Sequence, residues 1–87
     1  MKLLISKSAD KILSKQTSKI KKLIEDKLIK LQNAYPDTQG FDITKLKGTE
    51  DVYRLRIGAI RILIKIIPED EALFVFKIGF RGDVYKY

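Results

Sequence analysis

Apolar residues recur with two different periods along this 87-residue chain, and the period changes near residue 50. In the first half they are three and four residues apart, as in amphipathic helices with one buried face. In the second half nearly every second residue is apolar, as in strands that bury one side. The pattern therefore predicts helices in the first half of the chain and strands in the second.

Two helices and a short preceding strand are predicted in the first half. The strand covers Leu3–Ser6, and Ser8 is the expected N-cap of a brief first helix. Thr17 is the expected N-cap of a longer second helix, which ends at about residues 33–35, before Pro36. The apolar stripe of this second helix consists of Ile20, Leu23, Ile24, Leu28 and Leu31.

The alternating pattern in the second half predicts three strands, at Val52–Ile57, Ile60–Ile67 and Ala72–Ile78. Short turns separate them, so they are expected to form antiparallel hairpins. The stretch 41–50 before them is expected to hold a short strand or a turn. We therefore predict one α+β domain spanning residues 1–87. Two N-terminal helices pack on one face of a small, mostly antiparallel twisted sheet, in the order β-α-α-β-β-β.

Alternation along these strands assigns their two sides. The side expected to face the helices carries Ile60, Ile62, Ile64 and Ile66, and on the last strand Phe74, Phe76 and Ile78. The opposite side carries Arg54, Arg56, Arg61, Lys65 and Lys77. The nearby acids fall in turns, which leaves this side of the three strands without a carboxylate. A cationic surface of this kind indicates binding to a phosphate backbone.

The composition also supports binding to a phosphate backbone, and it excludes several kinds of catalytic and metal-binding site. Eighteen Lys and Arg against eleven Asp and Glu give a formal charge of +7, and the chain has no Cys and no His. Disulfides, the usual zinc ligands and thiol or histidine catalysis are therefore excluded. No apolar run approaches the roughly 20 residues that cross a membrane, so a cytoplasmic protein without metal, cofactor or membrane partner is expected. Lys, Arg and Tyr can still cleave RNA, whose 2′-hydroxyl supplies the nucleophile.

Three segments carry a resemblance to a known family: Lys45–Gly48, Tyr53–Gly58 followed by Arg61, and Gly79–Tyr85. Together with the order of elements, they resemble the RelE-like branch of the RelE/ParE family over nearly the whole chain. This family comprises the toxins of type II toxin–antitoxin pairs. Members of the branch cut messenger RNA in the ribosomal decoding site, leaving a 2′,3′-cyclic phosphate, and an antitoxin silences them.

The resemblance implies a set of catalytic residues. Arg61 and Arg81 are expected to contact the scissile phosphate, and Tyr85 to stack on or activate the nucleotide. Lys45 and Lys47 are expected to act as a base or as charge stabilisers. The remaining cations of the strands are expected to bind RNA, namely Arg54, Arg56, Lys65 and Lys77. The expected partners are messenger RNA in the decoding site and a small, partly acidic antitoxin.

Two departures from the family pattern leave the activity open between three alternatives. Phe80 stands where many relatives have a histidine, and Ala59-Ile60 stands where many have an Asp-Tyr pair. The chain is therefore a ribosome-dependent endoribonuclease, a ParE-like non-enzymatic toxin that binds DNA gyrase, or a catalytically inactive relative. For Arg54 and Arg56 a structural role, pairing with carboxylates of the turns, is the competing assignment.

Overall fold

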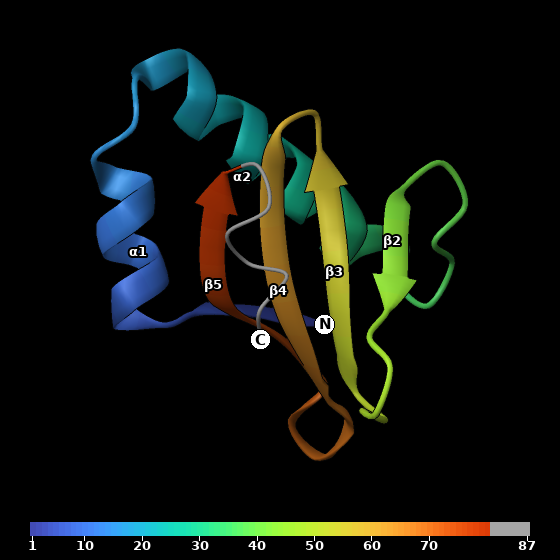
Figure 1. Ribbon diagram of the computed structural model, residues 1–87. Coiled ribbons are helices and arrows are strands. Elements are labelled where there is room, and N and C mark those ends of the chain that lie inside the picture. Colours follow the sequence, from blue (N-terminus) through green and yellow to red (C-terminus); the bar gives the residue numbers. More distant parts are fainter. Residues whose placement is uncertain (81–87) are drawn as a thin grey trace.

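The computed structural model describes residues 1–80, which form a five-stranded sheet with two helices (Figure 1). The elements are β1 (Lys2–Ile5), α1 (Lys7–Ser14), α2 (Ser18–Ala34), β2 (Asp42–Lys45), β3 (Val52–Ile57), β4 (Ile60–Ile67) and β5 (Ala72–Phe80). The sheet order is β1-β5-β4-β3-β2, in which β1 runs parallel to β5 and all other neighbours are antiparallel. The predicted α+β fold is confirmed.

Two of the predicted strands, β3 and β4, have the expected bounds, whereas β1 begins and ends one residue earlier than predicted and β5 extends to Phe80. The stretch 41–50 contributes β2, a four-residue edge strand that pairs with β3, so four strands follow the helices. Three of the four residues of β2 are exposed, which explains why its apolar pattern was too weak to decide between strand and turn.

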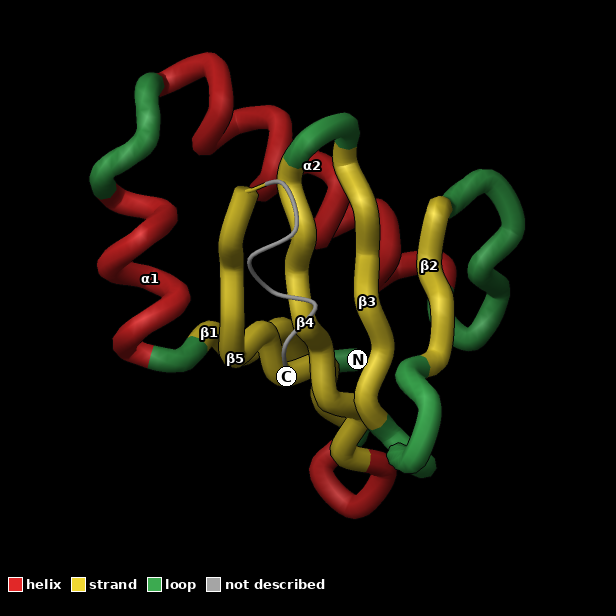
Figure 2. The backbone as a smooth tube through the Cα atoms, in the orientation of Figure 1, coloured by secondary structure: helices red, strands yellow, loops and turns green. Residues whose placement is uncertain are grey.

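The N-cap of α1 is Ser6, and the prediction of Ser8 was wrong. The Ser6 Oγ accepts a hydrogen bond from the Ala9 N–H at 3.1 Å. Its backbone N–H donates to the Val75 carbonyl at 2.8 Å, and its hydroxyl lies 3.3 Å from the Phe76 carbonyl, to which it donates. Ser6 caps the helix because these contacts hold it at the point where the chain leaves the edge of β5. Beyond that point α1 takes the place of β1 beside β5 (Figure 2).

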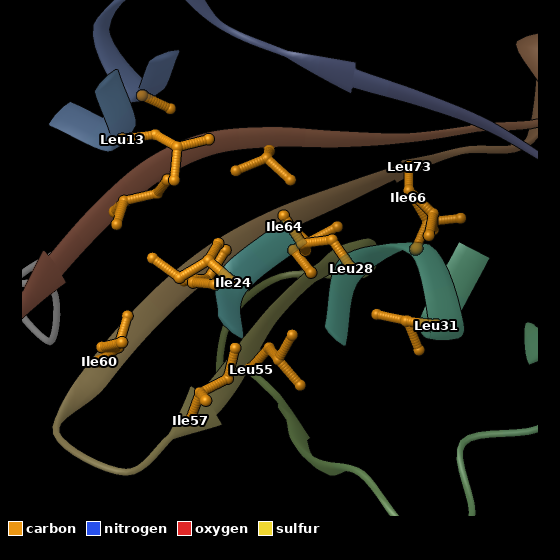
Figure 3. Close-up of a cluster of buried hydrophobic side chains, with 14 residues drawn as sticks. Leu13, Ile24, Leu28, Leu31, Leu55, Ile57, Ile60, Ile64, Ile66 and Leu73 are labelled. Atoms are coloured by element: carbon orange, nitrogen blue, oxygen red, sulfur yellow. The ribbon is translucent and has the colours of Figure 1, made fainter. Parts of the chain in front are cut away.

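The long helix α2 covers one face of the sheet and contributes three fully buried residues, Ile24, Leu28 and Leu31, to the core (Figure 3). Its predicted cap is confirmed, because the Thr17 hydroxyl accepts a hydrogen bond from the Ile20 N–H at 3.3 Å. Leu23 belongs to the predicted apolar stripe but is 44% exposed. Within residues 1–80, neither helix combines the length and the apolar character needed to span a membrane.

A bulge between β4 and β5 reverses part of the predicted side assignment. Leu63 lies opposite Lys77, but the next residue, Ile64, lies opposite Val75, so Phe76 is an extra residue in β5. Because sides alternate with a period of two, one extra residue shifts every side chain on the other side of the bulge. Val75 joins the core in place of the two phenylalanines, together with Leu73 and Ile78. The prediction that Phe74 and Phe76 face the helices was therefore wrong.

Candidate nucleic-acid interface

We call the sheet surface turned away from α2 the open face. In the orientation of Figure 1 it looks toward the viewer, and no helix of residues 1–80 covers it. Strand register brings onto this face the cations Arg54, Arg56, Arg61, Lys65 and Lys77. Five of the cations predicted from the sequence are thus gathered on one surface by three neighbouring strands.

Three arginines lie on the β3–β4 hairpin of the open face, toward its turn. Arg56 and Arg61 are directly opposite each other in the β3–β4 hairpin, and Arg54 lies two residues further along β3, opposite Leu63. Like charges in directly opposed positions of an antiparallel pair destabilise a sheet, whereas a bound phosphate would be stabilised by both of them. The pairing of Arg56 with Arg61 therefore favours an anionic ligand at this position.

A carboxylate from the edge strand reaches the open face as well. Asp42 on β2 lies opposite Arg56, and its Oδ2 is 3.1 Å from the Arg56 Nε. The three long strands carry no acid on this side, as predicted, but β2 adds one that the sequence reasoning did not place there. The side chains of Arg56 and Asp42 are 45% and 56% exposed, so the ion pair is weak and open to competition by a ligand.

The Arg61 guanidinium is held in position by the backbone of the β3–β4 turn. Its Nη1 donates to the Gly58 carbonyl at 2.7 Å and to the Ile60 carbonyl at 3.3 Å. Gly58 has a φ of +60°, a conformation that glycine adopts without a steric cost. The turn thus fixes a half-buried cation at one end of the hairpin before any ligand arrives.

The two lysines of the open face are both exposed. Lys65 lies on β4 opposite Val52, and its Nζ is 4.0 Å from Oδ2 of Asp51, at the limit of an ion pair. Lys77 lies on β5, opposite Leu63. They extend the positive surface from the three arginines across β4 and onto β5.

Lys45 and Lys47 are not gathered with the arginines. In the β2–β3 register Lys45 lies opposite Tyr53, which packs against the core, so the register assigns Lys45 to the helix side of the sheet. Lys47 is exposed in the turn that follows β2. Sequence spacing alone could not show the position of Lys45, because the register with β3 decides which side of the sheet each residue of the short strand β2 faces. The catalytic roles expected for these two lysines therefore have no support from their positions.

Two further predicted catalytic residues, Arg81 and Tyr85, lie outside the described residues. Among the tyrosines of residues 1–80, Tyr35 and Tyr53 both pack against the core. Burial raises the pKa of the Tyr35 hydroxyl, and the neighbouring Tyr53 raises that pKa further. Within the same residues, no group of three or more Asp and Glu side chains is placed to hold a metal ion.

A groove of about 430 Å³ separates α1 from β5. Its lining comprises Ser8, Ala9, Lys11, Ile12, Lys15, Lys77 and Ile78. Three lysines and no acid thus surround a partly apolar floor. The sequence reasoning did not single out Lys11 and Lys15, although their spacing of four residues places both on the same face of a helix.

The sequence matches no protein-family model, but it resembles a curated archaeal protein. It is 41% identical over 46 residues to the RelE1 toxin of Methanocaldococcus jannaschii. The aligned residues make up 53% of this chain and 51% of that protein, so the match spans about half of the relative's length.

Solved structures match over most of both chains. The RelE–RelB complex from Pyrococcus horikoshii is 25% identical, with a TM-score of 0.79, and the match covers 93% of this chain and 94% of that one. The antitoxin–toxin complex RelB–RelE from Methanococcus jannaschii is 27% identical, with a TM-score of 0.76 and coverage of 97% and 96%. The isolated RelE toxin of E. coli is 25% identical, with the same TM-score and coverage of 98% and 90%.

The order of elements, the sheet topology and the exposed cationic face thus define a small α+β protein with the RelE fold. The resemblance seen in the sequence is confirmed by these matches. In both sequence and fold the chain is thus similar to RelE toxins.

Proposed function

We propose that this protein is the toxin of a toxin–antitoxin pair and that it cuts messenger RNA on the ribosome, in the cytoplasm. One observation carries the proposal: Arg54, Arg56 and Arg61 converge on an open sheet face, with Arg61 fixed by its bonds to the hairpin turn. The curated relative is described as a toxin, and this supports the assignment to a toxin–antitoxin pair.

The proposed chemistry uses the RNA as its own nucleophile. The 2′-oxygen attacks the adjacent phosphorus, and the bond from phosphorus to the 5′-oxygen breaks. The products are a 2′,3′-cyclic phosphate and a 5′-hydroxyl. A base takes the proton of the 2′-hydroxyl, and the departing 5′-oxygen gains a proton. Negative charge gathers on the phosphate oxygens in between, and the arginines stabilise it. Arg81 and Tyr85 keep their predicted roles at the phosphate and the nucleotide as part of this proposal.

Cleavage is tested by primer extension on messenger RNA bound to purified ribosomes, with and without the protein. Discrete cuts within translated codons are expected. Arg61→Ala should reduce the rate of cutting about 10²–10³-fold, as the loss of one transition-state donor does elsewhere. Arg61→Lys keeps the charge but lacks the planar guanidinium that donates two hydrogen bonds to one phosphate. Its cleavage rate should lie between those of the unaltered protein and Arg61→Ala. Lys22→Ala removes an exposed cation of α2 and serves as the matched control.

Intact RNA in every reaction would refute the nuclease proposal. Inhibition of DNA gyrase supercoiling by the same preparation would then favour the ParE-like alternative. Absence of both effects, in a protein with an unchanged thermal unfolding curve, would favour the inactive relative.

We also infer that an antitoxin with an acidic segment binds this protein. The structural relatives from two archaea are complexes of RelE with RelB, which favours a partner of the same kind here. The groove between α1 and β5 supports this inference, because Lys11, Lys15 and Lys77 surround its apolar floor. Acidic side chains beside apolar ones would be complementary to such a surface.

The RelB chain of the Methanococcus jannaschii complex is a practical probe for this interaction. Its binding should weaken by more than about tenfold in the double variant Lys11→Glu, Lys15→Glu, because opposite charges are replaced by like charges. The double variant Lys19→Glu, Lys22→Glu has the same net charge, with both changes on exposed positions of α2. Equal loss in both variants would show that only net charge matters and would exclude the groove.

A further inference from the structure

Two aromatic side chains lie on the open face because of the bulge in β5. Phe74 is opposite Lys65 on β4, which places it on the same side of the sheet as the cations. Phe76 is the extra residue of the bulge, and its ring stacks on that of Phe74 with centroids 6.3 Å apart and an interplanar angle of 26°. The two rings therefore form a continuous aromatic surface, which we call the Phe74–Phe76 platform.

The platform does not belong to the main hydrophobic core. Neither phenylalanine is among the buried residues of the core cluster or the partly buried residues packed against it. Both rings are half-buried, so each keeps part of its surface exposed. On the β1 side, Leu4 is opposite Phe74 and is 42% exposed. Burial against α2 thus does not account for aromatic residues at these two positions.

Cations border the platform. Lys65 is the direct cross-strand neighbour of Phe74, and Lys77 follows Phe76 in the chain. Both lysines are exposed. Aromatic rings beside exposed cations on an open sheet surface are the combination that binds single-stranded nucleic acid, because the bases stack on the rings while the cations contact the phosphates.

We propose that the Phe74–Phe76 platform stacks bases of single-stranded RNA and so holds the strand next to the arginines of the open face. The inference rests on the proposed function in one respect, namely that RNA is the ligand of this face. Stacking on a flat ring is tolerant of sequence, since every base has a π-face. The platform thus adds affinity without selecting a codon.

The test measures binding of a short 2′-O-methyl oligoribonucleotide, which cannot be cleaved, by fluorescence anisotropy. Phe74→Leu and Phe76→Leu keep an apolar side chain but remove the ring, and each should weaken binding about fivefold or more. Phe74→Tyr keeps the ring and should bind as the unaltered protein does. Phe41→Leu removes a ring that packs against the core, and is the matched control.

Two further measurements separate stacking from charge. The slope of affinity against salt concentration should stay unchanged in the leucine variants, because they remove no phosphate contact, whereas Lys65→Ala should reduce it. An abasic oligonucleotide with the same phosphates should bind equally to the unaltered protein and to the double leucine variant.

The platform is refuted if the double leucine variant binds the oligoribonucleotide as tightly as the unaltered protein, or if the abasic strand shows the same loss. Absence of any binding by the unaltered protein also refutes it. Its failure is distinguishable from failure of the proposed nuclease, because binding is measured without cleavage. If the protein cuts RNA and neither substitution changes its binding, the nuclease proposal stands and only the proposed base stacking is refuted.

Discussion

The two faces of this one sheet differ in what their side chains do. The helix side packs Leu55, Ile62 and Ile64 against α2, and among residues 1–80 no polar or charged residue is buried. The open face carries arginines and lysines, and the ion pairs that Arg56 and Lys65 form there are exposed. Most of the buried apolar side chains lie on the helix side, although Leu63 and Val52 are buried on the side of the open face. The cations of the open face are therefore more free to vary with a ligand than the residues of the core.

The largest effect on stability is expected on the helix side. Leu28→Ala removes a leucine that is 1% exposed and leaves a cavity between α2 and the sheet. The free energy of unfolding should fall by about 2–5 kcal/mol. Chemical denaturation measures the change. Leu23→Ala, in the same helix at a position that is 44% exposed, should change it by less than about 0.5 kcal/mol. Equal losses would contradict the observed orientation of α2.

A smaller effect is expected at Ser6, where β1, α1 and β5 meet. Ser6→Ala removes the hydroxyl that caps α1 and that also donates to the Phe76 carbonyl. The free energy of unfolding should fall by about 1 kcal/mol. Ser8→Ala should have little effect, because Ser8 lies within the helix and is exposed. The opposite result in thermal unfolding would restore Ser8 as the cap.

On the open face, removal of a cation should change binding and leave stability nearly unaltered. Arg56→Ala should weaken binding of uncleavable RNA and reduce the slope of log affinity against log salt by about 0.7, the value for one phosphate contact on a single strand. The free energy of unfolding should change by less than about 1 kcal/mol, because the ion pair with Asp42 is exposed. A large loss of stability with unchanged binding would assign Arg56 to the scaffold.

The smallest effect is expected at Asp42. Asp42→Asn removes the one carboxylate that β2 contributes to this face, and stability should change by less than about 0.5 kcal/mol. RNA affinity should rise, because a phosphate no longer competes with Asp42 for Arg56. Titration of both proteins with the same oligonucleotide tests this. Weaker binding by the variant would show that Asp42 orients Arg56 for the ligand.

Local patterns were sufficient to predict most of the fold. The bounds of β3 and β4 and the cap of α2 at Thr17 follow from the side-chain period and from the chemistry of a single capping residue. Short segments carried the resemblance to RelE-like toxins, and the structural matches agree with it. The predicted cations Arg54, Arg56 and Arg61 share a face because alternation along β3 and β4 depends only on these two strands.

Other features depended on contacts between distant segments. The bulge that moves Phe74 and Phe76 onto the open face appears only when β5 is paired with β4, since one extra residue leaves no mark in the sequence. The side taken by Lys45 is set by its pairing with β3, and the cap at Ser6 by the backbone of β5.

The sequence by itself determined the two periods, and with them the helices, the strands and a positive surface free of histidine and cysteine. Periodicity is a local property, because each residue's side follows from its neighbours in the chain. Only the tertiary structure decided which cations lie on one face, where Asp42 pairs with Arg56, and which aromatic residues lie on the same side of the sheet as the cations. Register between strands is non-local, and a shift of one residue exchanges the two faces.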